Sequence, residues 1–423
     1  MGAFLSLLYN TYMKHRVGLD RQTSEGLKDM EKKMVYLHDD LITCFLLRLP
    51  IRSLLRLRCV SKSWFSLISD PKFAIWHLEL AAAPTHRLLY LPTHVYASQT
   101  LSIDLDAPSF LIRNASTPLN TSFLPPDSFT DIRGSCNGLV LLSVGYSNLF
   151  LWNPTSGFHK SLPLSPIVDS NNHSLNFTFL YGFVHDASTD DYLVLLGSNE
   201  FVSSSLEIFF EFFSLRTNVW NKIEGTHLPY TLQNPRTGTL LNGIIHWFVC
   251  HNDTRVNVIL AFDVKERDFS EMPLPIDFNI SDNVNFCDLC VLKGFLSLYN
   301  RPDDLTVEIW MLQEYKVHSS WTKAIVVNTD NLHKICFSPI CSTKSGDIVG
   351  KTICSTKSDD TDGNKKNNEE MVVKYNAEGQ LLEQRSYHDN QHEFNVVMYT
   401  ESLLSFPVVC NQAVEDEGHI DEA

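Results

Sequence analysis

The chain has 423 residues, and its 49 acidic and 34 basic side chains give a formal net charge of −15 at pH 7. This balance argues against a general nucleic-acid binder, because such proteins cluster Lys and Arg on one surface. No uninterrupted apolar run reaches the length of a membrane-spanning helix, so we expect no membrane span. The ten cysteines show no regular pairing, which favours reduced thiols and a location in the cytoplasm, the nucleus or both.

Residues 1–33 precede the first helical pattern and are interpreted as an N-terminal extension. The chain begins Met-Gly-Ala-Phe-Leu-Ser, which fits the loose N-myristoylation pattern. A plain extension is the simpler interpretation, and Met30 and Met34 are alternative start sites.

Residues 34–80 carry four short helical patterns in succession. Pro50 ends the first, and Ser53, Ser61 and Asp70 are the expected N-caps of the other three. A unit this small cannot bury much apolar surface, yet it holds more large apolar side chains than a four-helix core can hide. The pattern favours an apolar face that binds another protein, and the alternative is packing on the rest of the same chain.

The four helical patterns contain a characteristic series of residues. It consists of Leu37, Leu41-Ile42, Leu46, Leu49-Pro50, Ser53-Leu54-Leu55, Cys59-Val60-Ser61-Lys62-Ser63-Trp64 and Leu67-Ile68. This series resembles the F-box motif, although His38 replaces the usual proline. In that family the helices dock on the Skp-type adaptor of cullin-based (SCF) ubiquitin ligases. The resemblance implies adaptor contacts by Leu37, Leu41, Ile42, Leu49, Pro50, Leu54, Leu57, Val60 and Trp64.

From about residue 85 the pattern changes to short apolar runs separated by Pro, Asn, Asp and Gly. Strands that follow one another without intervening helices indicate an all-β sandwich, barrel or propeller. An internal repeat favours the propeller: an apolar pair, a short polar residue and a tight turn recur at Asn153, Ser214 and Asp263, and more weakly at Asn376. Residues 307–325 show the same strand pair with a longer connection, and the number of blades stays open.

The same part of the chain resembles the F-box-associated domain of plant F-box proteins. The matching pieces are CNGLVLL (136–142), LWNPTS (151–156), YGFVHDASTDDYLVL (181–195), LNGIIHWF (241–248) and AFDVKERDFSEMPLP (261–275). The expected fold is therefore α+β and multidomain, with a small all-α F-box (34–80) followed by an all-β kelch-like propeller (85–405) and an acidic disordered tail (406–423).

Three stretches resemble metal or catalytic sites, and each has a simpler explanation. Residues 358–369 resemble a calcium loop but lack flanking helices, so a plain acidic loop is preferred. Cys287 and Cys290 form a CxxC without a second pair, and strand alternation would place the two thiols on opposite faces. His246-Trp247 lies in an apolar strand and is expected to be structural. We predict no metal, no cofactor and no catalytic residue.

The polar stretches 164–176, 198–205, 226–239 and 276–285 are the expected specificity loops of the propeller. Phe201, His227, Tyr230 and Arg236 supply aromatic and cationic groups suited to a substrate interface. The sequence thus predicts a non-catalytic substrate-recognition subunit of an SCF-type ubiquitin ligase, linked through the adaptor to a cullin. The alternatives are an F-box scaffold without an active ligase and an autonomous propeller enzyme or lectin-like module. The substrate and the pathway stay open.

Overall fold

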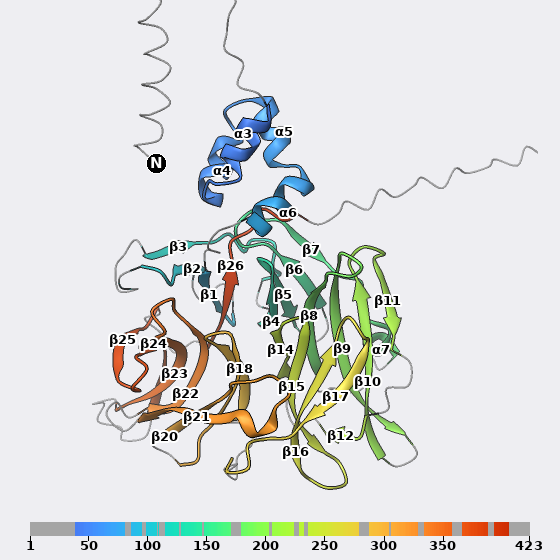
Figure 1. Cartoon of the computed structure of the whole chain (residues 1–423), viewed down its shortest axis with the longest axis vertical. Helices are drawn as coiled ribbons and strands as arrows, with labels where there is room; N and C mark the ends of the chain where they lie inside the picture. The colour runs from blue at the N-terminus through green and yellow to red at the C-terminus, as the bar shows by residue number, and fades with distance from the viewer. Residues whose placement is uncertain are drawn as a thin grey trace, which may run out of the picture. The chain divides into compact units, whose positions relative to one another are not determined.

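The structure is a computed structural model, shown in Figure 1. It describes residues 39–80, 86–94, 99–107, 109, 115–126, 128–145, 148–170, 179–202, 205–223, 228–231, 236–278, 287–303, 306–328, 334–357, 366–387 and 393–405. The chain divides into two compact units, Met1–Leu49 and Pro50–Ala423. No helix among the described residues is both long enough and apolar enough to cross a membrane.

Four helices are described before the first strand: α3 (Asp39–Leu46) in the first unit, and α4 (Ile51–Leu57), α5 (Lys62–Ile68) and α6 (Pro71–Leu80) in the second. Two predicted caps are confirmed, because the Ser61 hydroxyl accepts the N–H of Trp64 and the Asp70 carboxylate accepts that of Lys72. The predicted start of α4 at Ser53 is wrong. That helix begins two residues earlier, directly after Pro50, whose fixed φ leads the chain into the first turn.

The strands of the second unit form six sheets, which we number as blades 1 to 6. Blade 1 consists of β26 (Phe394–Thr400), β1 (His86–Pro92), β2 (Leu101–Asp104) and β3 (Ser116–Pro118). Blade 2 consists of β4 (Thr130–Cys136), β5 (Leu139–Val144), β6 (Asn148–Trp152) and β7 (His159–Ser161). Blade 3 consists of β8 (Phe179–Asp186), β9 (Asp191–Val202), β10 (Ser205–Ser214) and β11 (Val219–Lys222), with β13 (Arg236–Thr237) parallel to β8.

Blade 4 consists of β14 (Thr239–Leu241), β15 (Ile244–His251), β16 (Asn257–Asp263) and β17 (Asp268–Met272), with β12 (Tyr230–Thr231) also paired to β15. Blade 5 consists of β18 (Asp288–Leu292), β19 (Phe295–Asn300), β20 (Thr306–Leu312) and β21 (Trp321–Asn328). Blade 6 consists of β22 (Lys334–Ser342), β23 (Ile348–Lys357), β24 (Lys366–Tyr375) and β25 (Leu381–Arg385). Two short helices, α7 (Pro166–Ser170) and η3 (His318–Ser320), lie in connections.

The six blades close into a ring, which confirms the propeller and sets the blade count that the sequence left open. The innermost strands contact one another in the cyclic order β26, β4, β8, β14, β18, β22 and back to β26. Apolar clusters fill the spaces between neighbouring blades; for example, Leu195 of blade 3 packs with Trp247 of blade 4. The apolar clusters of the described residues are each shared by two neighbouring blades, so the sheets support one another when stacked.

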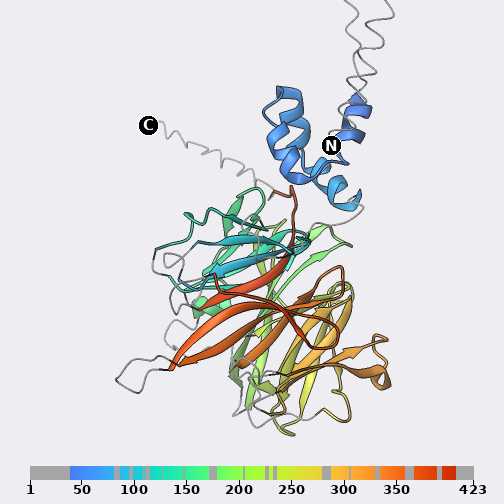
Figure 2. The ribbon, with the colours of Figure 1, turned by 90° about the vertical axis from the view of Figure 1, so that its left-hand side faces the viewer.

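Blade 1 joins the two ends of the propeller. Its second strand, β1, pairs along its whole length with β26, so that His86 lies opposite Thr400 and Pro92 opposite Phe394. Figure 2 shows the red C-terminal strand among the blue-green strands from the start of the propeller. This pairing closes the ring by backbone hydrogen bonds between strands far apart in the sequence.

The repeated polar residue is confirmed as the start of a turn in four blades. A side-chain oxygen of Asn153, Ser214, Asp263 or Asn376 accepts backbone N–H groups two to four residues later, at 2.8 to 3.2 Å. Asp104 accepts the N–H of Asp106 at 3.0 Å in blade 1, a copy that the sequence comparison missed. Each of these turns joins the third and fourth strands of its blade. Asn, Asp and Ser favour such turns because their side chains readily bond nearby backbone N–H groups.

Antiparallel strands place the connections of every blade on two opposite faces of the ring. Turns between the first and second and between the third and fourth strands lie on one face, where the chain enters β1; we call it the entry face. The other connections lie on the opposite face, which we call the loop face. The described ends of the four predicted loops lie on the loop face, and residues 171–176, 203–204, 226–227, 232–235 and 279–285 lie outside the described residues. Residues 198–202 and 205 belong to β9 and β10, so this stretch is a strand hairpin rather than an open loop.

Candidate functional site

The helical segment exposes large apolar side chains to solvent. Leu41 in the first unit and Val60, Phe65, Trp76 and Leu80 in the second each keep between 47% and 63% of their surface exposed. Exposed apolar side chains at this density are typical of protein-binding surfaces, because water contact with them is unfavourable.

The residues predicted to bind an adaptor differ in their exposure. Leu41, Pro50 and Val60 are exposed, and Ile42, Leu49, Leu57 and Trp64 are partly exposed. Leu54 is completely buried, so it supports the interior of its segment rather than forming an open contact surface, while Leu37 lies outside the described residues.

Three exposed residues, Phe65, Trp76 and Leu80, were not among the predicted contacts. The excess of apolar residues over what small helices can bury was the available signal. That excess predicts that an exposed apolar face exists, but it does not identify the residues that form the face.

A second candidate site lies at the mouth of the ring on the loop face, where the innermost strands begin. Arg133 of β4 contacts Asp131 at 2.6 Å and lies over the Tyr181 ring, with its guanidinium carbon 4.6 Å from the ring centre. The amide of Asn395, at the start of β26, donates to Asp131 at 3.0 Å. Charged and amide groups from blades 1 and 2 therefore meet an aromatic ring from blade 3 at this edge of the ring of blades.

Arg236 lies in another part of the same mouth, beside blades 4 and 5. Its guanidinium donates to the carbonyl of Cys287 at 2.9 Å, lies 3.3 Å from the Asp288 carboxylate and stands over the Phe248 ring at 5.3 Å. These contacts bind β13 to blades 4 and 5 and leave little of the side chain exposed. The sequence signal that could have identified this mouth is the alternation of polar and apolar residues in an innermost strand, as in Asp131-Ile132-Arg133.

The other residues predicted to contact substrate are differently placed. Tyr230 is 2% exposed, and its hydroxyl donates to Glu271, so the structure gives it an internal role between blades. Burial and the neighbouring Glu271 raise the pKa of Tyr230 above its usual value. The side chain of Phe201 and all of His227 lie outside the described residues.

His246-Trp247 is structural, as predicted. The His246 ring is buried between the carbonyl of Thr239 and the hydroxyl of Tyr315, at 3.1 and 2.7 Å, and Trp247 donates to the carbonyl of Tyr181 at 2.8 Å. Burial lowers the pKa of His246 to about 4, so the imidazole is neutral at physiological pH.

The CxxC thiols point to opposite sides of blade 5, as strand alternation predicts, with Cys287 directly before β18 and Cys290 within it. Cys287 packs between blades 4 and 5, and Cys290 packs between blades 5 and 6. Both are free, and burial raises the pKa of Cys287 to about 11. No group of three or more His, Cys, Asp or Glu side chains in the described part of the chain has metal-binding geometry, and most of residues 358–369 lies outside that part.

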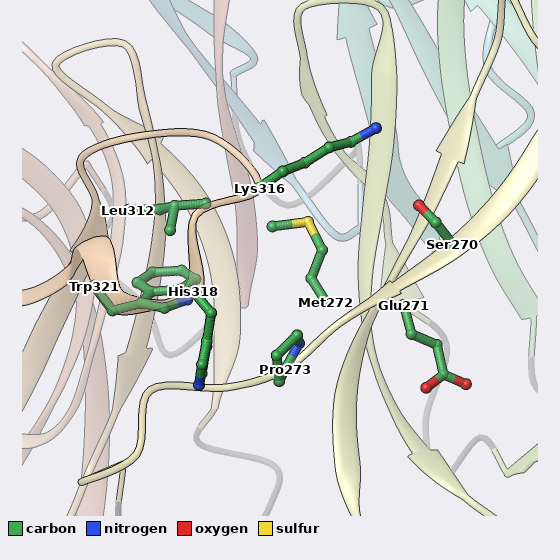
Figure 3. A pocket seen from close by; sticks show the side chains of 8 residues that line it. All are labelled: Ser270, Glu271, Met272, Pro273, Leu312, Lys316, His318 and Trp321. Atoms are coloured by element: carbon green, nitrogen blue, oxygen red, sulfur yellow. The ribbon is translucent and has the colours of Figure 1, made fainter.

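Figure 3 shows a small pocket between blades 4 and 5, of about 230 Å³. Its lining residues are Ser270, Glu271, Met272, Pro273, Leu312, Lys316, His318 and Trp321. Met272, Leu312 and Trp321 are buried and apolar, Lys316 extends across one side, and the Glu271 carboxylate points away.

The arrangement of a short helical segment before a six-bladed propeller with its C-terminal strand in the first blade defines a class of two-part interaction proteins. Residues 36–76 match the F-box domain, and residues 89–406 match the F-box associated beta propeller domain. The chain therefore belongs to the F-box proteins that carry an F-box-associated propeller.

Curated relatives agree with this membership. An F-box protein of Arabidopsis thaliana, CPR1, is 30% identical over 311 residues, which cover 68% of this chain and 72% of the relative. An F-box/kelch-repeat protein of the same plant is 29% identical over 297 residues, covering 67% and 77%. The likeness to solved structures is weak: an oligogalacturonate lyase from Vibrio parahaemolyticus shares 8% identity at a TM-score of 0.34, covering 73% and 78%, and carries no argument about function.

Proposed function

We propose that this chain is the substrate-recognition subunit of an SCF-type ubiquitin-protein ligase. Its F-box helices bind a Skp-type adaptor, and through it a cullin, while the propeller holds a protein substrate. The observation that supports this most is the pairing of exposed apolar helices with a ring whose apolar residues are buried between blades. The chain itself makes or breaks no bond; it raises the effective concentration of substrate lysines near a ubiquitin-loaded enzyme.

On the adaptor side, the contacts are carried by the exposed and partly exposed residues. These are Leu41, Ile42, Leu49, Pro50, Leu57, Val60 and Trp64 from the F-box resemblance, with Phe65 added because of its exposure. Leu37 remains a proposed contact on the resemblance alone. Burying such apolar side chains against a partner removes them from water, which is the main driving force of protein association.

On the substrate side, the proposed surface is the loop face. The mouth of the ring provides Asp131, Arg133 and Arg236 in fixed positions. Surface connections around such a scaffold tolerate changes in sequence and length that would disrupt a blade. Phe201 and His227 remain proposed contacts in those connections. We further propose a cytoplasmic or nuclear location, which the free cysteines of the described residues support, because reduced thiols persist there.

The adaptor half of this proposal is tested by co-purification of the full chain with a Skp-type adaptor and a cullin. Val60→Asp combined with Phe65→Asp places two charges on the exposed helical surface and is expected to abolish co-purification. Val326→Asp is the matched control, because Val326 is an exposed apolar residue on the outer strand of blade 5. Retained binding by the double variant would contradict the proposed adaptor surface.

The ligase half needs a second measurement. The purified complex is given ubiquitin, the activating and conjugating enzymes and proteins captured by proximity labelling in plant tissue. Transfer of ubiquitin to a captured protein supports a receptor, whereas stable adaptor binding without transfer to any captured protein would indicate the scaffold alternative.

A further inference from the structure

The outer edges of blades 2 and 3 meet in a seam that is apolar and basic. Edge strands β7 and β11 are both labelled in Figure 1, and each bonds to a residue that flanks the other. Lys160 Nζ of β7 donates to the side chain of Asn218, directly before β11, at 2.8 Å, and Trp220 Nε1 of β11 donates to the carbonyl of Pro163, shortly after β7, at 2.9 Å. We call this surface the edge seam. It is formed by Phe158, Lys160, Leu164, Trp220 and Lys222.

The residues of the edge seam combine one face of β11 with exposed apolar side chains from the edge of blade 2. Trp220 and Lys222 lie on the same face of β11, opposite Phe213 and Glu211 of β10. The Glu211 carboxylate on this face accepts a hydrogen bond from Ser165 of blade 2. Phe158 and Leu164 are 49% and 43% exposed, at the two ends of the blade 2 edge. Two large exposed apolar side chains flanking partly exposed Trp220 make a strip that water covers poorly.

The charge on the seam is positive at its surface. Lys160 donates to a neutral amide, and burial lowers its pKa below the ordinary lysine value. Glu211 lies beneath Lys222, completely buried and bonded to Ser165 and the Ile167 N–H. The seam is therefore complementary to a segment that combines apolar and acidic residues.

The end of the described chain is fixed beside this seam. Asn153 donates from its side chain to the carbonyls of Ser402 and Leu404, at 3.1 and 2.8 Å. Asn153 begins the turn that ends at Phe158, whose carbonyl accepts the Asn153 N–H at 2.8 Å. Asn153 therefore holds Leu404, near the end of the described chain, next to the turn that carries Phe158 of the edge seam.

Residues 406–423, which lie outside the described part, read FPVVCNQAVEDEGHIDEA. Apolar residues come first, and five carboxylates follow within the last nine positions. An extended chain of this length reaches about 60 Å at most, so the seam is well within its range. We propose that the edge seam is the docking surface for this C-terminal segment of the same chain, which covers it against other proteins.

Tethering makes this contact strong in effect even where the isolated contact is weak. A segment attached next to its own site experiences an effective concentration in the millimolar range, so it excludes competing peptides of similar composition. Opposite charges on the two partners make the contact sensitive to ionic strength.

The first test uses the full chain and a variant of it, Glu415→Gln with Asp416→Asn and Glu417→Gln. A fluorescein-labelled synthetic peptide of residues 406–423, with Cys410→Ser to prevent oxidation, is titrated into each, and anisotropy is read. We expect the peptide to bind the variant at least tenfold more tightly than the native chain, because the neutralised segment competes poorly. Equal affinities, or no binding to either protein, would overturn the proposal.

The second test locates the site. In the same tail variant, Lys160→Glu with Lys222→Glu is expected to weaken peptide binding at least tenfold, and Phe158→Glu is expected to weaken it to a similar extent. Val219→Glu is the matched control, since Val219 is 52% exposed on β11 but alternates to the other face of that strand. Thermal melting confirms folding, and full peptide binding by the lysine variant would place the tail elsewhere.

The third test distinguishes a tail that binds its own chain from one that binds a second copy. Hydrogen exchange at residues 158–161 and 219–222 is compared between the native chain and the tail variant over a hundredfold range of protein concentration. Protection in the native chain that does not depend on concentration supports docking within one chain. Protection that appears only at high concentration would overturn it in favour of exchange between copies.

Discussion

The helices before the propeller and the propeller itself solve the same physical problem in opposite ways. Both are rich in apolar residues, but α5 and α6 expose Phe65, Trp76 and Leu80, whereas the inner strands bury nearly all of theirs between blades. A repeated architecture supplies each sheet with a neighbour, and a short helical segment has none of equal size. The difference teaches that apolar content alone does not predict stability; the availability of a partner decides whether it becomes a core or an interface.

The largest effect is expected where the propeller core is emptied. Trp247→Ala removes a buried ring that packs against Phe210 and loses the hydrogen bond to Tyr181, which together lower the free energy of unfolding by about 3–5 kcal/mol. Urea denaturation followed by far-UV circular dichroism measures this. Trp76→Ala, at an exposed helical site, is the control and is expected to change stability by less than about 0.5 kcal/mol. Similar losses for the two variants would break the comparison.

The next effect concerns binding rather than folding. Leu49→Ala with Pro50→Ala removes an apolar contact and the fixed angle that leads into α4, and we expect adaptor affinity to fall by about 30- to 1,000-fold, or about 2–4 kcal/mol. Surface plasmon resonance against the immobilised adaptor measures the change. The melting temperature of the propeller should stay unchanged, and undiminished affinity would exclude this docking mode.

A smaller effect depends on pH. Because burial holds the pKa of His246 at about 4, against about 6.5 in an unfolded chain, the unfolded state binds a proton that the folded state does not as pH falls between these values. His246 therefore costs stability below pH about 6.5, at a slope approaching about 1.4 kcal/mol per pH unit, and costs nothing above it. Denaturation curves at pH 5 and pH 7.5 should show a smaller difference for His246→Gln than for the native chain. An unchanged difference would show that His246 is protonated in the fold.

The smallest effect sharpens the role of the repeated turn. Asn153→Ala loses the turn bonds to Thr155 and Ser156 and leaves the carbonyl of Leu404 without its side-chain donor, for a cost of about 1–2 kcal/mol. Asn376→Ala in blade 6 removes an exposed turn of the same kind without buried partners, and we expect about 0.5–1 kcal/mol. Chemical denaturation of both variants measures the difference, and a larger loss for Asn376→Ala would contradict the assigned anchoring role of Asn153.

Local chemistry made much of this fold predictable. The turn residues Asn153 and Asp263 carry their hydrogen-bonding preference in their own side chains, so their positions follow from sequence, and so does the alternation that separates Cys287 from Cys290. The closing pair of β1 and β26 does not follow in this way, since it joins segments about 300 residues apart through backbone groups that every residue shares.

The candidate sites were less predictable for the same reason. Tyr230 looks like a loop residue in sequence, but the short strand β12 places it between blades 3 and 4, where its hydroxyl meets Glu271. Leu54 fits the apolar face of its helix equally well whether that face is interior or exposed, and only the three-dimensional arrangement shows that it is interior. Periodicity identifies a face and does not say what covers it.

The closing strand also sets an order of events during synthesis. The helices leave the ribosome first, whereas β1 gains its partner only after residues 394–400 have been made, roughly 15–60 s later at about 5–20 residues per second. During that interval the nascent chain has its helical segment but an open ring. A message that ends early would yield a chain that carries the helices proposed to bind the adaptor but has no finished propeller, and we expect such a chain to compete with the complete protein.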